Sequence, residues 1–244
     1  MAWFPGADTS VKGNTSGAYK GGPWKIVHHT TEGSSAEGAF SAYRNNDTWP
    51  HFTVDSETIY QHVDTDTAAS AVLNQSGGVE TNRLSAIQIE VVTFAGEPTK
   101  PQATLRNVAR LCRWLEAEHG IPAVWPSGAP RYGTSDPGGH NRSSSNWTSL
   151  SGHYAHSQVP ENSHWDSSYW PDDLAIVMEP EMEAIRIVVN GTDQTEAIGA
   201  WLSQGNSVMD ISDWCAYAGY APPVWDNAAR AVHVSTEKVN DARG

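Results

Sequence analysis

Cysteine is scarce in this chain. Its 244 residues include only Cys112 and Cys215, which lie far apart and form no Cys-x-x-Cys motif. Two such cysteines exclude a protein held together by a disulfide framework. Cys112 falls on the apolar stripe of a predicted helix, so we expect a buried thiol there.

Long apolar runs are also missing. No segment reaches the length that a membrane-spanning helix needs, so we expect no membrane span. The N-terminus, MAWFPGADTS, has neither a charged n-region nor an extended apolar stretch. We therefore expect a protein made in the cytoplasm without a signal peptide.

Basic residues are few relative to acidic ones. Lys and Arg total 15 against 28 Asp and Glu, which gives a formal net charge of −13. Because no basic patch or Lys/Arg run is present, nucleic acid is excluded as an expected partner. The hydrophobic fraction of 39% is ordinary, so the chain is expected to fold.

Strand and helix patterns alternate along the first 120 residues. Apolar strands are predicted at 24–29, 51–54, 58–63 and 86–92. Helices are predicted to begin at the capping box Ser34-Ser-Ala-Glu37 and to span 102–119, before Gly120. This order predicts an α/β fold, with a central mixed β-sheet flanked by helices. Residues 121–151 are rich in Pro, Gly, Ser and Asn and are predicted to form a functional loop over a cleft.

A second pattern begins after residue 178. A strand is predicted at 185–189, an Asn190-Gly191 turn follows, a helix is predicted at 210–218, and 231–234 forms a closing strand. We therefore expect two domains, the first over 1–178 and a small α+β module over 179–244.

Histidines gather in two places in the first domain. His28-His29 ends the first predicted strand, and the segment 152–166, GHYAHSQVPENSHWD, holds three histidines and one aspartate. Neutral imidazole and carboxylate are suitable zinc ligands, and three protein ligands suit a catalytic zinc ion. The spacing does not match a helical His-Glu-x-x-His motif, so these residue types alone leave the ligands open.

Three separated motifs resemble one known family. Ile26-Val-His28-His29-Thr30, Ile87-Gln-Ile-Glu90 and His156-x9-Asp166 are similar to motifs of the type 2 N-acetylmuramoyl-L-alanine amidases, in the same order. That family is related to peptidoglycan recognition proteins. The opening MAWFPGA and Gly77-Gly-Val-Glu-Thr-Asn82 also resemble endolysins of phages that infect actinobacteria.

The resemblance implies a Zn²⁺ cofactor and its ligands. The first ligand in the family is the His before x-Thr/Ser, which implies His28 and not His29. His156 and Asp166 would complete the set, with His153 as a lower-ranked competitor of His156.

The resemblance also implies which residues handle protons. Glu90 corresponds to the carboxylate that accepts a proton from the attacking water and passes it to the leaving nitrogen. His164 stands where some members carry an oxyanion-stabilising Lys. Trp49, Trp125 and Trp147 are expected either to line the cleft or to pack in the core.

Two departures from the family pattern are present. Asp166 is followed by Ser167-Ser168 where relatives have Pro-Gly, and Pro50 replaces a Tyr that precedes the His-Phe pair in some relatives. The first departure affects the loop that orients a ligand. The second leaves Glu90 as the sole expected proton carrier.

The function implied is hydrolysis of the amide bond between N-acetylmuramic acid and L-alanine in bacterial peptidoglycan. Such an endolysin would act on the cell wall after release from the cytoplasm. Two alternatives stay open: a module that binds peptidoglycan without cutting it, and a zinc peptidase that cuts within the stem peptide. The C-terminal module resembles the stalk domain named after the N-terminus of copper amine oxidases. Its position suggests a cell-wall-binding role, and a structural or oligomerising role stays open as the alternative.

Overall fold

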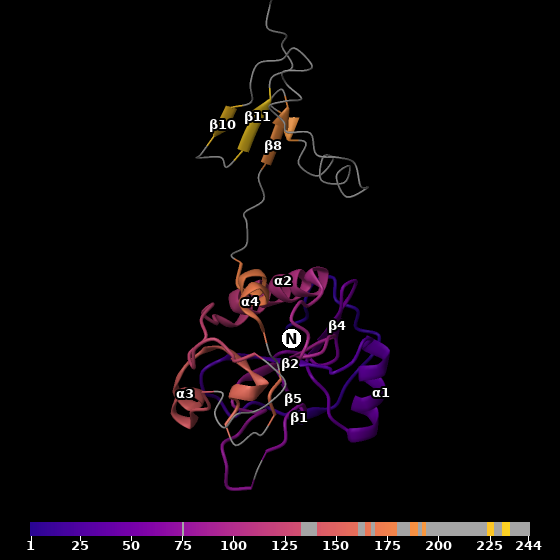
Figure 1. Cartoon of the computed structure of the whole chain (residues 1–244), viewed down its shortest axis with the longest axis vertical. Coiled ribbons are helices and arrows are strands. Elements are labelled where there is room, and N and C mark those ends of the chain that lie inside the picture. Colours follow the sequence, from indigo (N-terminus) through magenta and orange to yellow (C-terminus); the bar gives the residue numbers. More distant parts are fainter. Residues whose placement is uncertain are drawn as a thin grey trace, which may run out of the picture. The chain divides into compact units, whose positions relative to one another are not determined.

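The computed structural model divides into two compact units, Met1–Pro180 and Glu181–Gly244 (Figure 1). The structure describes residues 1–74, 76–132, 141–160, 164–166 and 169–179, together with four strands of the second unit. No helix within these described residues is long and apolar enough to cross a membrane.

A five-stranded mixed sheet forms the centre of the first unit. Its order is β4-β3-β6-β2-β7, and only the β3–β4 pair is antiparallel. The strands are β2 (Lys25–Thr30), β3 (Phe52–Val54), β4 (Ile59–Gln61), β6 (Ala86–Val91) and β7 (Gly152–Ala155). The expected α/β fold with a central mixed sheet is therefore confirmed.

Alternation along β6 assigns the two faces of this sheet. Ile87, Ile89 and Val91 belong to the main hydrophobic core, whereas Gln88 and Glu90 lie between them in the sequence. Because successive side chains of a strand point to opposite faces, Gln88 and Glu90 share the other face.

Helix α2 (Gln102–His119) covers the core face. Its buried side chains recur at helical spacing, and the chain leaves the helix at Gly120, which has a φ of 63°. This left-handed conformation suits glycine and ends the helix where the sequence predicts. The short helix α4 (Pro171–Val177) packs against α2 in the same layer (Figure 1).

Helix α1 (Ala36–Asn46) belongs to a second hydrophobic cluster with Trp49 and Val92. The N-cap is Ser35, whose side chain accepts a hydrogen bond from the Gly38 amide. The predicted capping box at Ser34 is thus wrong by one residue, because Ser35 is the residue with extended dihedral angles that the cap requires. The hydroxyl of Tyr43 on α1 contacts Thr53 of β3.

The loop predicted over 121–151 contains one helix, α3 (Ser144–Ser149), within its described part. Residues 152–155, at the start of the histidine-containing segment 152–166, form β7, which is buried throughout and pairs with β2. A 3-10 turn, η1 (His156–Gln158), follows directly. A separate two-stranded sheet joins β1 (Thr15–Gly17) and β5 (Ala68–Ala69).

The second unit contains a four-stranded sheet of order β10-β11-β8-β9. These strands are β8 (Arg186–Val189), β9 (Thr192–Asp193), β10 (Val224–Asp226) and β11 (Ala231–Val234). The strands predicted at 185–189 and 231–234 correspond to β8 and β11. The predicted turn at 190–191 and helix at 210–218 lie outside the described residues.

Candidate active site

Two groups of potential metal ligands flank strand β2. One comprises His29, His156 and Asp166, and the other comprises His28, Cys112 and His153. Within each group the candidate ligand atoms lie within 4.8 Å of one another. The adjacent histidines of β2 belong to different groups because consecutive strand side chains point to opposite faces.

The structure does not bring His28 together with His156 and Asp166, which corrects the expected grouping. His28 lies on the same face of β2 as the core residue Ile26, whereas His29 lies on the opposite face. His29 is the residue that pairs in register with Glu90. Both faces of β2 are buried, so burial along this strand does not distinguish the two histidines.

A glutamine fixes the orientation of the His29 ring. The His29 Nε2 atom lies 2.7 Å from Gln88 Oε1, so Nε2 carries the proton and donates it. The Gln88 amide nitrogen in turn donates to the Thr81 carbonyl at 3.3 Å, which keeps Oε1 facing the ring. His29 Nδ1 is therefore the nitrogen with a free lone pair, and it lies 3.9 Å from both Glu90 Oε1 and Asp166 Oδ2.

His156 and Asp166 meet at the end of β7. His156 begins η1, and its Nδ1 atom lies 3.0 Å from Asp166 Oδ1. The Asp166 carboxylate also accepts from the Thr30 amide at 3.4 Å, and the Asp166 carbonyl accepts from the Ser157 amide. Backbone at the ends of β2 and β7 thus positions the carboxylate. The next two residues, Ser167 and Ser168, lie outside the described residues.

The charge states of these groups suit a cation. Burial is the main cause that lowers the pKa of His29 to about 3, with a further contribution from His156. Burial alone would raise the pKa of Asp166, but the neighbouring histidines, His156 first, lower it to about 2. Near neutral pH, His29 is a neutral imidazole and Asp166 is a carboxylate, as metal ligation requires.

Glu90 stands beside the group on the same face of the sheet. Its side chain is 17% exposed, and Oε2 is buried with no hydrogen-bond partner. Burial, reinforced by Asp166 and Glu32, raises the pKa of Glu90 well above its ordinary value. An unpartnered buried carboxylate oxygen beside three ligand atoms indicates that a further group belongs here.

His164 lies at the exposed side of the group. Its ring stacks on that of His156 with centroids 4.6 Å apart, and its Nδ1 atom lies 3.7 Å from Asp166 Oδ1. The side chain is 66% exposed, so it can reach a bound substrate. Burial and the neighbouring His156 lower the pKa of His164.

The donor set fits a catalytic zinc ion. Two imidazoles and one carboxylate are the ligands that catalytic zinc sites use, and such sites keep one position open. The side chains of His156 and Asp166 are 12% and 11% exposed, so this group borders solvent. In contrast, His28, Cys112 and His153 are each fully buried.

Two residues of this cluster were not selected from the sequence. His29 is the first, and Gln88 is the second. The alternation of 86–91 places Gln88 on the same face of the sheet as Glu90. Which side chain of β2 Gln88 contacts depends on the register between β2 and β6. Of the tryptophans, Trp49 and Trp147 are core residues, and the ring of Trp125 packs against those of His28 and His153.

The sequence profile of one protein family matches residues 20–167, and its description is N-acetylmuramoyl-L-alanine amidase. This match spans more than half of the chain and contains His29, Glu90, His156 and Asp166. No curated protein sequence matches the chain.

Several solved structures are similar to part of this chain. A ligand complex of the Staphylococcus aureus hydrolase AmiA is 19% identical, with a TM-score of 0.48, over 72% of this chain and 83% of that chain. The endolysin amidase LysCS from Clostridium intestinale is 15% identical, with a TM-score of 0.44, over 72% and 96%. A mutant endolysin from Bacillus subtilis is 28% identical, with a TM-score of 0.33, over 48% and 76%. These TM-scores are low, and the assignment depends on the family profile: the chain belongs to the N-acetylmuramoyl-L-alanine amidase family of peptidoglycan hydrolases.

Proposed function

We propose that the first unit cleaves the amide bond between N-acetylmuramic acid and L-alanine with a zinc ion held by His29, His156 and Asp166. The observation that carries this proposal is the placement of Glu90. Register pairs it with His29, and its Oε1 atom lies 3.9 Å from His29 Nδ1. A carboxylate at this distance from the ligand atoms can accept a proton from a water molecule held between them.

In this proposal each residue of the site has a separate role in the reaction. Zinc, when bound, supplies Lewis-acid polarisation of the scissile carbonyl and of water. Glu90 accepts the proton of the attacking water and delivers it to the leaving nitrogen of L-alanine. His164, stacked on His156 at the exposed side, donates a hydrogen bond to the oxygen that becomes negatively charged. Gln88 holds His29 in the tautomer that offers Nδ1.

A catalytic role is better supported than binding alone. A recognition module needs neither a complete ligand set nor a buried, unpartnered carboxylate oxygen, and this site has both. A zinc peptidase that cuts within the stem peptide would use the same groups, so the position of the cut must be measured.

We further propose that the chain acts as an endolysin of a phage with an actinobacterial host and reaches the wall after release from the cytoplasm. The segments MAWFPGA and 77–82 support this origin. In this proposal residues 1–178 form the catalytic domain. The wall-binding role of residues 179–244 stays a prediction.

Mass spectrometry of fragments released from purified actinobacterial peptidoglycan tests the reaction. We expect free stem peptides that begin at L-alanine, lost on chelation and restored by zinc. Cleavage inside the stem peptide would instead establish the peptidase. Binding without cleavage, by protein that carries zinc, on several wall chemotypes would establish the recognition module.

A further inference from the structure

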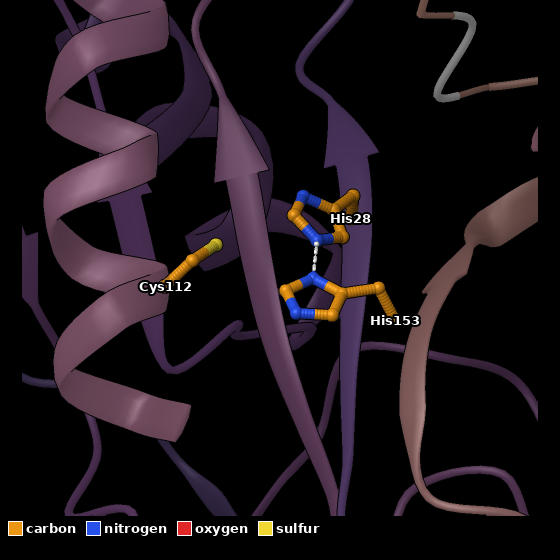
Figure 2. A group of neighbouring side chains, drawn as sticks. All are labelled: His28, Cys112 and His153. Atoms are coloured by element: carbon orange, nitrogen blue, oxygen red, sulfur yellow. Dashed lines mark hydrogen bonds between the residues drawn. The ribbon is translucent and has the colours of Figure 1, made fainter. Parts of the chain in front are cut away.

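The second group of potential metal ligands lies in the core, on the opposite face of β2 from the proposed catalytic site. His28 comes from β2, Cys112 from α2 and His153 from β7, and all three are fully buried. Figure 2 shows the Cys112 sulfur directed from the helix toward the two imidazole rings. Because its three side chains are fully buried, this cluster plays no part in the proposed reaction.

The two histidines present one nitrogen each to the same space. His28 Nε2 and His153 Nδ1 lie 3.0 Å apart (Figure 2). The remote nitrogens are held by oxygen atoms: His28 Nδ1 lies 3.1 Å from the Tyr169 hydroxyl, and His153 Nε2 lies 2.9 Å from Glu116 Oε1. An oxygen partner behind each ring is the arrangement that orients metal-ligating histidines.

Glu116 is itself fixed. Its Oε1 atom accepts from Arg113 Nη2 at 2.6 Å, one turn earlier on α2. The helix that supplies Cys112 therefore also supplies the carboxylate behind His153. Because Cys112 and Glu116 lie on the same helix, their relative positions are fixed.

The distances are close to those of a bound ion. Two nitrogen ligands at about 2.0–2.1 Å in tetrahedral geometry are roughly 3.3 Å apart. The observed 3.0 Å separation must widen by a few tenths of an ångström. The remaining ligand-atom separations, within 4.8 Å, must close by about 1 Å. Side-chain rotation can supply both changes.

A hydrogen bond between His28 and His153 explains why the two rings lie close together. It does not explain why the Cys112 sulfur lies beside them. We propose that His28, Cys112 and His153 bind a second, structural metal ion of the thiophilic d¹⁰ class, Zn²⁺ or Cu⁺. Thiolate and imidazole together select such ions. Binding releases the Cys112 thiol proton to solvent and shifts the proton between the rings to His28 Nδ1, which then donates to the Tyr169 oxygen.

Cobalt substitution separates the two sites, because only this one contains sulfur. Full-length protein expressed with Co²⁺ is expected to bind two equivalents and to show a sulfur-to-cobalt charge-transfer band in the near ultraviolet. Cys112→Ser should remove the band and one equivalent, whereas Cys215→Ser should keep both. Asp166→Ala should lose the Co²⁺ equivalent of the proposed catalytic site and keep the charge-transfer band. The band therefore tests the second site independently of the proposed function.

A second variant covers the case in which Cys112→Ser fails to fold. Glu116→Gln keeps the three ligands and should weaken Co²⁺ binding at this site by about 10–100-fold. Elemental analysis of protein grown without added metal, with chelator competition for each ion, distinguishes Zn²⁺ from Cu⁺. A folded protein that shows no charge-transfer band, or a band that disappears with Cys215→Ser, would overturn the proposal.

Discussion

Gln88 provides a test of how the site fixes its first ligand. Its Oε1 atom accepts the His29 Nε2 proton at 2.7 Å, so Nδ1 keeps the lone pair that faces Glu90 and Asp166. In Gln88→Leu this acceptor is replaced by an apolar group of similar size. The imidazole either keeps an unsatisfied buried N–H group or moves its proton to Nδ1, where it blocks metal binding.

The size of the effect can be worked in two ways. Leaving a buried donor unsatisfied costs about 1–3 kcal/mol. Losing an outer-shell partner lowers metal affinity by about 10–100-fold, which is roughly 1.4–2.8 kcal/mol at 1.4 kcal/mol per tenfold change. The two ranges overlap, so we expect the zinc dissociation constant to rise by about 10–100-fold.

Competition with a chromogenic zinc chelator measures this constant on folded protein. Gln61→Leu is the matched control, because Gln61 is also a fully buried, hydrogen-bonded glutamine but contacts Phe4, Ala2 and Val63. It should lower the free energy of unfolding without changing zinc affinity. Equal zinc affinity in wild type and Gln88→Leu would refute the assigned role of the Gln88–His29 hydrogen bond.

Three further predictions concern single side chains. Glu90→Gln should lower the rate of muramoyl-peptide release by about 10²–10⁴-fold while bound zinc stays near one equivalent at this site, and a smaller loss would move proton transfer elsewhere. Asp166→Ala should lose both activity and zinc at this site, as elemental analysis and fragment release can check, and full activity would place the metal elsewhere. Burial lowers the pKa of Lys25 to about 7, below its unfolded value, so the fold disfavours its charged form and the wild type should gain stability as pH rises from 7 to 10. Urea unfolding should show that gain, at most about 1.4 kcal/mol per pH unit, in wild type relative to Lys25→Met, and parallel pH curves for the two proteins would contradict it.

Regular patterns in the sequence predict most of the scaffold. The apolar spacing of 102–119 and the following Gly120 give helix α2 with its observed bounds, and the alternation of 86–92 gives β6, which ends at Val91. Both patterns are local, because a helical stripe or a strand face depends on near neighbours in the chain. Strand β7 escaped prediction because Gly152–Ala155 is short and its burial depends on segments distant in the sequence, such as its partner strand β2.

The choice between His28 and His29 required the assembled sheet. Each histidine lies on a buried face of β2, so the sequence offers no polar or apolar alternation to separate them. Only the register with β6 shows that His29 shares a face with Glu90. The family resemblance did place His156 and Asp166 together, and in the structure His156 Nδ1 lies 3.0 Å from Asp166 Oδ1.

Diffraction data collected at the zinc absorption edge from crystals of the full-length protein test the central claim most directly. We predict an anomalous peak bonded to His29 Nδ1, His156 and Asp166, with Glu90 beside it. Anomalous density at the His28–Cys112–His153 cluster alone, in protein that releases muramoyl-linked stem peptides, would contradict it.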